Sequence, residues 1–426
     1  MVAAFGRLKL GPFVEAELRG RDVGRVGCGY RGFTRVGVVA LLLALVLGGP
    51  SVAPAAAQQP TEAVAAGQLV GLLNSVPAAP EVSYGTLDNT GQQVATIKII
   101  PSSCGSGYIG VYHYEDPDGE FYVRVGTSSD LLHWTYAATL ATNASQPTIA
   151  ALSNGGFLVA SEKYIPSVLG LFTELGNSSL TSEVSQVESN PTVGDLLNPL
   201  AAATGVENLA YGTTHLEFHF YPNCSDLLSG IATETFDAPM SLSDQDEGTP
   251  SLGSISLGAP STVLAPMSNS TIQVGFHYYD TTIDRDRNAT GVLTDFSNWT
   301  EQTNTPLNSA FPATVHGNIG GRDYLNFEGY PFTIIEAENT EGDFGTWRVY
   351  LYDDTTDTLT PLAPSGGSES FGNPKVTVLT DPAGQCALVV SLFVFNPGNG
   401  PNPAGPLIYY NPFSPSGTQQ GCAGAS

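Results

Sequence analysis

YIGVYHYEDPDGEFYVRVGTSSDLLHW, residues 108–134, is the stretch that decides the fold class. It has a strand pattern with aromatic residues, an acidic turn, a second strand pattern, and an Asp followed four residues later by Trp. IQVGFHYYDTTIDRDRNATGVLTDFSNW, residues 272–299, repeats this order. FTIIEAENTEGDFGTWRVYLYDDTTDTLTPL, residues 332–362, repeats the two strands and the turn, with its Trp out of phase. Such repetition predicts a unit that buries its faces only against copies of itself.

A shorter pattern precedes several of these units: SQPTIAAL at Ser145, GTPSLGSI at Gly248, GNPKVTVL at Gly372 and, more distantly, HGNIGGRDYL at His316. Each unit then has an opening strand, a hairpin and a closing turn, which is the four-stranded blade of a β-propeller. We predict an all-β, five-bladed β-propeller with antiparallel blades that start near these four positions and near Tyr84.

The closing phrase has a structural explanation. Its Asp can accept hydrogen bonds from backbone N–H groups of the turn, as Asp130 would do. Its Trp can bury a large apolar face between neighbouring blades, as Trp134 and Trp299 would do. We therefore predict that the phrase stabilises the blades and does not bind a ligand.

The first residues of the chain have the pattern of an export signal. Val36 to Leu47 is an apolar run, preceded by scattered basic residues and followed by small ones, so residues 1–57 are interpreted as a signal peptide with an extended basic lead-in. Residues 58–82 are expected to form a helical segment and linker outside the propeller, with the helix at Thr61 to Asn74, and residues 83–426 to form the propeller. We expect a secreted monomer with no membrane insertion once the signal is removed.

The charge excludes several partners. The chain has 15 basic and 40 acidic residues, a net charge of −25, and the signal segment contains seven of the basic residues but three of the acidic ones. Such a surface repels nucleic acid and anionic lipid, whereas a neutral glycan or a cation is compatible. The four cysteines beyond the signal favour two disulfides, with three pairings open; they are Cys104, Cys224, Cys386 and Cys422.

A resemblance follows from two phrases, S-x-D-L-x-x-W at Ser128 to Trp134 and Glu247-Gly248-Thr249-Pro250. They resemble the propeller glycoside hydrolases that include arabinanases, arabinofuranosidases, xylosidases and invertases. In many of those enzymes a Glu-Gly-Pro at one blade opening supplies the general acid, which implies this role for Glu247. The families usually have an Asp at the first and at the second blade opening. This chain has Gln146 at the second, and only Asp88 near the first.

The resemblance implies a secreted hydrolase of a pentose- or furanoside-containing polysaccharide. Hydrolysis needs two carboxyl groups on opposite sides of the scissile bond. Glu247 would be the acid and Asp88 or Asp323 would activate water, with inversion if the carboxyls are far enough apart. Sugar hydroxyls would be bound by polar side chains near the blade openings, namely Gln146, His316, Asn318, Arg322 and Asn373.

Each candidate also has a structural interpretation. Glu247 can belong to a solvated acidic loop, Arg322 and Asp323 to a turn with an internal ion pair, and Asp88 to a turn. Strand glutamates can face the central cavity or solvent; they are Glu162, Glu217 and Glu336. The missing Asp at the second blade favours a non-catalytic, lectin-like propeller as the alternative, and a role without sugar stays open because fold does not fix function.

The segment Asp284 to Asn288, where acidic residues alternate with arginines, has the spacing of a calcium loop. The sixth position is Ala289, where an EF-hand loop needs Gly for its sharp turn. We interpret the segment as an exposed hairpin tip with ion pairs and predict no cofactor or metal, calcium being the only ion with any support.

Overall fold

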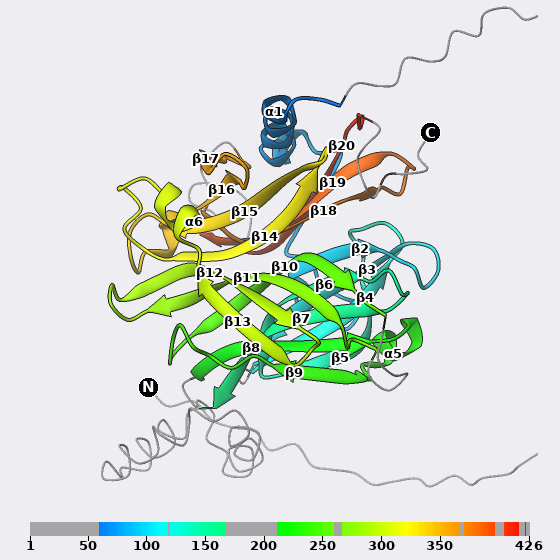
Figure 1. The fold of residues 1–426 in the computed structure, drawn as a ribbon. Coiled ribbons are helices and arrows are strands. Elements are labelled where there is room, and N and C mark those ends of the chain that lie inside the picture. Colours follow the sequence, from blue (N-terminus) through cyan, green and yellow to red (C-terminus); the bar gives the residue numbers. More distant parts are fainter. Residues whose placement is uncertain are drawn as a thin grey trace, which may run out of the picture. The chain divides into compact units, whose positions relative to one another are not determined.

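The computed structural model describes residues 59–117, 120–166, 211–259, 266–365, 370–396, 404–416 and Cys422. The predicted signal segment lies outside these residues, and so does most of 166–212, which the sequence predicts to be a long insertion in the second blade. The described strands form five four-stranded antiparallel sheets, shown in sequence colours in Figure 1. The inner strands of the five sheets contact one another in cyclic order around an axis. The predicted five-bladed propeller is confirmed.

The first three blades follow the order of the chain, from the inner to the outer strand. Blade 1 contains β2 (Ala95–Pro101), β3 (Tyr108–Glu115), β4 (Phe121–Ser128) and β5 (Thr135–Thr142). Blade 2 contains β6 (Ala144–Ala151), β7 (Phe157–Pro166), β8 (Tyr211–Tyr221) and β9 (Glu234–Asp237). Blade 3 contains β10 (Glu247–Leu257), β11 (Ser270–Asp280), β12 (Arg285–Thr294) and β13 (Asn298–Thr303).

Blade 4 contains β14 (Ile319–Phe327), β15 (Tyr330–Glu338), β16 (Trp347–Asp353) and β17 (Thr358–Pro361).

Blade 5 joins the two ends of the propeller. Blade 5 contains β18 (Ser370–Thr380), β19 (Cys386–Asn396), β20 (Gly405–Pro412) and, as its outer strand, β1 (Glu81–Tyr84). Because β1 pairs with β20, the N-terminal strand closes the ring and covers the edge that β20 would otherwise expose. The first blade therefore starts at Ala95 and not near Tyr84, as the sequence predicted. Tyr84 is the last residue of β1, the outer strand of blade 5.

The helices of the described residues lie between or outside the blades. They are α1 (Glu62–Leu73), η1 (Val76–Ala78), α5 (Cys224–Ser229), α6 (Thr305–Ala310) and η2 (Phe344–Thr346). The helix predicted from Thr61 is α1, and its buried residues Ala65, Leu69 and Leu73 share one apolar cluster with residues of blades 4 and 5. None of the helices in the described residues has the length and hydropathy that a membrane-spanning helix needs.

The closing phrase has the structural role predicted for it. Trp134 is buried in a cluster with side chains of blade 5, and Trp299 packs against a cluster formed by blades 2 and 3. The side chain of Asp130 accepts hydrogen bonds from the N–H groups of Leu132 and His133, at 3.0 and 2.9 Å. A Cβ at Gly291 would lie 2.1 Å from the Trp299 ring, so glycine there leaves room for the indole.

Two disulfides are present, as the even number of cysteines predicted. Cys104 bonds to Cys224 and thus ties blade 1 to α5, while Cys386 bonds to Cys422 near the C-terminus.

Candidate functional site

The inner strand of every blade has a register break close to its beginning. The breaks lie between Ala95 and Lys98, Ser145 and Thr148, Gly248 and Ser251, Ile319 and Arg322, and Gly372 and Lys375. In four blades the break contains a non-glycine residue with φ near +50°: Thr96, Gln146, Thr249 and Asn373. Such backbone conformations are costly for residues with a side chain and often occur at functional sites. The equivalent place in blade 4 is Gly320-Gly321.

These breaks converge around the axis. A Cβ at Gly321 would lie 2.9 Å from Cγ2 of Thr249 and 3.5 Å from Oδ1 of Asn373, so the breaks of blades 3, 4 and 5 are in contact. Lys375, which is 1% exposed, donates a hydrogen bond from Nζ to the carbonyl of Pro250 at 3.2 Å. Desolvation by burial lowers the pKa of Lys375 to about 8.

Buried acceptors on the second strands hold the breaks in place. The carboxylate of Glu162 accepts the N–H of Thr249 at 2.9 Å, and Nδ1 of His113 accepts the N–H of Gln146 at 3.2 Å. Glu336 accepts the N–H of Gly321 at 2.7 Å and also that of Asn373. The glutamates of β7 and β15 therefore face the interior, where they satisfy backbone groups that the bulges remove from the sheet ladder.

Some polar atoms in this region have no partner. Oγ1 of Thr96, Oε1 of Gln146 and Oγ1 of Thr148 are buried and form no hydrogen bond within the described part of the chain. Because an unpaired buried polar atom is costly, such atoms indicate a place for water or for a hydroxyl-bearing ligand.

Glu247, the predicted general acid, is buried beside its own loop. It is 1% exposed, and Oε1 accepts the N–H groups of Leu242 and Ser243 at 2.9 and 3.0 Å. Burial and the neighbouring carboxylate of Glu301 raise the pKa of Glu247 to about 8. A protonated carboxyl suits a general acid, but this one has almost no surface through which to meet a substrate.

Asp323, one of the predicted bases, is 1% exposed and forms an ion pair with Nζ of Lys98 at 2.6 Å. It also accepts the N–H of Val376 at 2.7 Å and the hydroxyl of Ser251 at 3.2 Å. These contacts tie blade 4 to blades 1, 3 and 5 across the axis, which is a structural use of the carboxylate.

Asp88, the other predicted base, lies in a turn before β2. Its carboxylate accepts hydrogen bonds from Arg124, Tyr112 and Thr90 at 2.8, 2.8 and 2.6 Å. Burial raises the pKa of Asp88, but the hydrogen bonds from Thr90, from Tyr112 and from the N–H of Gln92 outweigh it, and the net shift is downward. Asp88, Asp323 and Glu247 thus bond to separate sets of partners, and within the described residues none of these bonds joins two of the three carboxyls.

The predicted residues of blade 4 lie toward blade 3. Arg322 is 9% exposed and lies against Gly275 of β11, where a Cβ would collide with the guanidinium group. The carbonyl of His316 accepts a hydrogen bond from Arg285. Oδ1 of Asn318 accepts the N–H of Asp286 at 2.9 Å. Of the five predicted hydroxyl-binding residues, Gln146 and Asn373 are the two that lie at the axial breaks.

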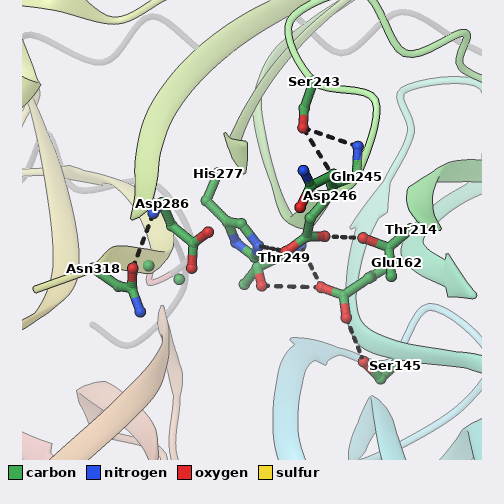
Figure 2. A network of polar contacts seen from close by, with 12 residues as sticks. Ser145, Glu162, Thr214, Ser243, Gln245, Asp246, Thr249, His277, Asp286 and Asn318 are labelled. Carbon is green, nitrogen blue, oxygen red and sulfur yellow. Dashed lines mark hydrogen bonds and ion pairs between the residues drawn. The ribbon is translucent and has the colours of Figure 1, made fainter. Parts of the chain in front are cut away.

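A cluster that the sequence did not predict lies beside Asn318 and is shown in Figure 2. One side-chain ligand atom from each of Asp246, His277 and Asp286 can be chosen so that all lie within 4.8 Å of one another. Nε2 of His277 is 3.1 Å from Oδ2 of Asp246, and the ring lies between the two carboxyl groups. In the sequence, Asp246 and Asp286 belong to separate acidic segments, which folding brings together.

The three groups have different electrostatic environments. Burial alone would lower the pKa of His277, but the Asp246 carboxylate raises it to about 10. Burial raises the pKa of Asp286 to about 6, against the opposing effect of His277. Asp246 accepts hydrogen bonds from His277 and from Oγ1 of Thr214, whereas the carboxyl of Asp286 accepts none within the described residues.

Aromatic rings gather on blade 1. The guanidinium carbon of Arg124 lies 4.0 Å from the ring centroid of Tyr114 and 4.4 Å from that of Tyr136. Tyr114 also stacks on Tyr122 with centroids 5.2 Å apart. The three tyrosines are half-buried.

Comparison with known proteins gives structural matches alone. No family model matches the sequence, and no curated protein matches it. Among solved structures, a glycoside hydrolase matches with 10% identity and a TM-score of 0.47, over 84% of this chain and 98% of the other.

Two further matches are enzymes of named activity. An α-L-arabinofuranosidase from Lactobacillus brevis has 9% identity and a TM-score of 0.44, over 77% of this chain and 93% of the other. An endo-arabinase from Bacteroides thetaiotaomicron has 11% identity and a TM-score of 0.40, over 78% of this chain and 98% of the other. The five-bladed propeller fold itself is established by the order of strands in the five sheets.

Proposed function

We propose that this protein is exported and binds a neutral glycan, as a lectin does, where the inner strands converge. The observation that carries the proposal is a pair of half-buried amide side chains at the axial breaks, Gln146 and Asn373, of which Gln146 has an Oε1 without a partner in the described part of the chain. Sugar hydroxyls both donate and accept hydrogen bonds, so they complement such oxygens.

Further features support a glycan. The net charge of −25 disfavours anionic ligands. The half-buried tyrosines of blade 1, Tyr114, Tyr122 and Tyr136, offer rings against which the apolar face of a sugar can pack. The two disulfides agree with an oxidising, extracellular location. Arabinose- and xylose-containing oligosaccharides are the first ligands to test, because the two sequence phrases at Ser128 and Glu247 resemble those of pentose-acting propellers.

The test is calorimetric titration of the exported protein with a panel of neutral oligosaccharides, with reducing-sugar release assayed in parallel. Gln146→Ala and Asn373→Ala should each weaken binding by about two- to tenfold, the value of one hydrogen bond between neutral groups. Gln302→Ala, on the exposed outer strand of blade 3, is the control and should bind normally. If no glycan binds, or if the axial variants bind as well as the control, the proposal is refuted.

Glycoside hydrolysis is the second candidate, and one observation favours it. Asp246 and Asp286 provide two carboxyls whose environments differ: Asp246 accepts two hydrogen bonds, while Asp286 accepts none within the described residues and has its pKa raised to about 6 by burial. Asp286 would be the acid and Asp246 the nucleophile. Their chosen oxygens lie within 4.8 Å, closer than the separation of about 6.5–9.5 Å typical of inversion, so this candidate predicts retention.

Product analysis separates the two candidates. Hydrolysis would be supported if Asp286→Asn abolishes sugar release while Asp284→Asn preserves it. NMR of the products should then show that the anomeric configuration is retained. Asp284 lies in the same hairpin but outside the cluster, so it controls for the loss of one charge. Binding without release would leave the lectin-like function alone.

A further inference from the structure

We infer that Asp246, His277 and Asp286 form a binding site for a divalent transition-metal ion, with Zn²⁺ as the ion it fits best. The inference does not depend on the glycan proposal. It begins from geometry, because three side chains of metal-binding type each offer a ligand atom within one 4.8 Å group.

The distances suit a small ion after a slight closure. Zn²⁺ binds imidazole nitrogen and carboxylate oxygen at about 2.0–2.2 Å, which places tetrahedral ligand atoms about 3.4 Å apart. Nε2 of His277 and Oδ2 of Asp246 are already 3.1 Å apart. The remaining adjustment falls on Asp286, whose carboxyl accepts no hydrogen bond in the described part of the chain and can therefore rotate.

The second observation is an orphaned nitrogen. The side chain of His277 is 10% exposed, its Nε2 faces Asp246, and its Nδ1 is buried without a hydrogen-bond partner among the described residues. A core histidine with a purely structural role normally satisfies both nitrogens. This ring lies between two carboxyl groups (Figure 2), and because the described residues form no hydrogen bond to Nδ1, that nitrogen can carry the proton and leave Nε2 unprotonated as a ligand.

The residues are also held as metal ligands usually are. Oγ1 of Thr214, on β8 of blade 2, donates to Asp246, and the N–H of Asp246 donates to Oγ of Ser243 at 3.2 Å. Asn318, next to blade 4, accepts the N–H of Asp286. Such outer contacts orient the ligands of a metal site and strengthen its affinity. The site would thus link blades 2, 3 and 4.

The donor set selects the class of ion. Imidazole suits Zn²⁺ and its transition-metal neighbours, while Ca²⁺ takes six to eight oxygen ligands. Three protein ligands leave one position open in a four-coordinate site. The side chain of Asp246 is 33% exposed, so solvent or a small ligand has access to the cluster. An ion bound to Asp286 would prevent it from acting as a free acid, so added zinc should inhibit any hydrolysis that depends on this residue.

The experiment is a calorimetric titration of tag-free, EDTA-treated protein with ZnCl₂, and with MnCl₂ and CaCl₂ for comparison. We expect one Zn²⁺ per chain, bound more tightly than Ca²⁺. Asp286→Asn and His277→Gln should each weaken zinc binding at least about tenfold, and Thr214→Val should weaken it by about tenfold through loss of the outer contact. Matched controls are Asp284→Asn in the same hairpin and His133→Gln, whose side chain is 88% exposed.

Each outcome decides the question. Zinc binding that the cluster variants lose and the control variants keep supports the site. Failure of the wild-type protein to bind zinc, equal loss in the controls, or unchanged binding in Asp286→Asn overturns it. If His277→Gln does not fold, Asp286→Asn and Thr214→Val carry the test. The first changes a carboxyl that accepts no hydrogen bond from the described residues, and the second removes a single hydroxyl contact.

Discussion

Replacing Glu336 by glutamine should change how the stability of the propeller depends on pH. Glu336 is 4% exposed on β15 and accepts the N–H groups of Gly321 and Asn373. Burial raises its pKa from 4.5 to about 7, against the opposing effect of the two N–H donors. The folded protein therefore holds a proton on this carboxyl at a pH where the unfolded chain has released it.

The sign and the size follow from linkage. Because the folded pKa is raised, the stability associated with Glu336 is fully present below the unfolded pKa of 4.5 and is lost as the pH rises through about 7. This rise in pKa corresponds to about 3 kcal/mol in total, of which about 2.5 kcal/mol is lost between about pH 5 and pH 8. The side chain is almost fully buried, so solvent screening does not reduce this value appreciably.

The Glu336→Gln variant would lose this titration, but its new amide would keep only one oxygen to accept two N–H groups. The unpaired N–H should cost about 1–3 kcal/mol at every pH. The diagnostic quantity is therefore the change with pH in the difference between variant and wild type, since a constant cost cancels from it.

Urea unfolding followed by tryptophan fluorescence at four pH values between about 5 and 8 gives this quantity, since Trp134 and Trp347 are buried. The wild type should lose about 2.5 kcal/mol more than Glu336→Gln over the range. Asp130→Asn is a contrasting control: burial raises the pKa of Asp130, but hydrogen bonds from His133 and Leu132 outweigh this and lower it to about 2. Its contribution is lost only as the pH falls through about 2. Parallel curves for wild type and Glu336→Gln would refute the argument.

Three other changes test how the blades are joined. Trp134→Ala should cost about 3–5 kcal/mol in chemical unfolding, and a cost below about 1 kcal/mol would contradict the burial of Trp134 between blades 5 and 1. Lys98→Met leaves the buried Asp323 without its cation and should cost about 3–5 kcal/mol, most of which Lys98→Met with Asp323→Asn should recover; no recovery in the double variant would argue against the ion pair. Loss of the bond between Cys104 and Cys224, which lie 120 residues apart in the sequence, should lower stability by about 2–5 kcal/mol, and an unchanged thermal midpoint would speak against it.

The repeated strand pattern is sufficient to predict the blades, because each blade has the same order of strands and turns. It also locates the inner strands that begin near Ser145, Gly248 and Gly372. It does not predict that β1 closes blade 5. The four residues Glu81–Tyr84 are short and belong to no repeat, and their pairing with β20 is decided by the geometry of the ring.

Side-chain direction near the breaks is harder to predict from sequence. Alternation along a strand fixes which face a residue occupies, but a bulge adds a residue and changes the phase. Glu247 lies immediately before such a break, and its carboxyl bonds to its own loop. Gln146 and Asn373, each followed by proline, lie within the breaks themselves. His277 and Asp286 come from a hairpin of blade 3, and their meeting with Asp246 has no local signal in the sequence.

The breaks also explain why acidic residues near the axis are poor evidence for catalysis in this propeller. Each bulge removes a backbone N–H from the ladder, and a buried N–H needs an acceptor. Glu162 and Glu336 supply acceptors to neighbouring blades, and His113 does the same for Gln146. The presence of an ionisable residue in such a place is already explained by the backbone N–H that it accepts, so it is not evidence for a substrate. A carboxyl that accepts no backbone N–H from the described residues, as Asp286 does not, therefore has the stronger claim to a role in binding or chemistry.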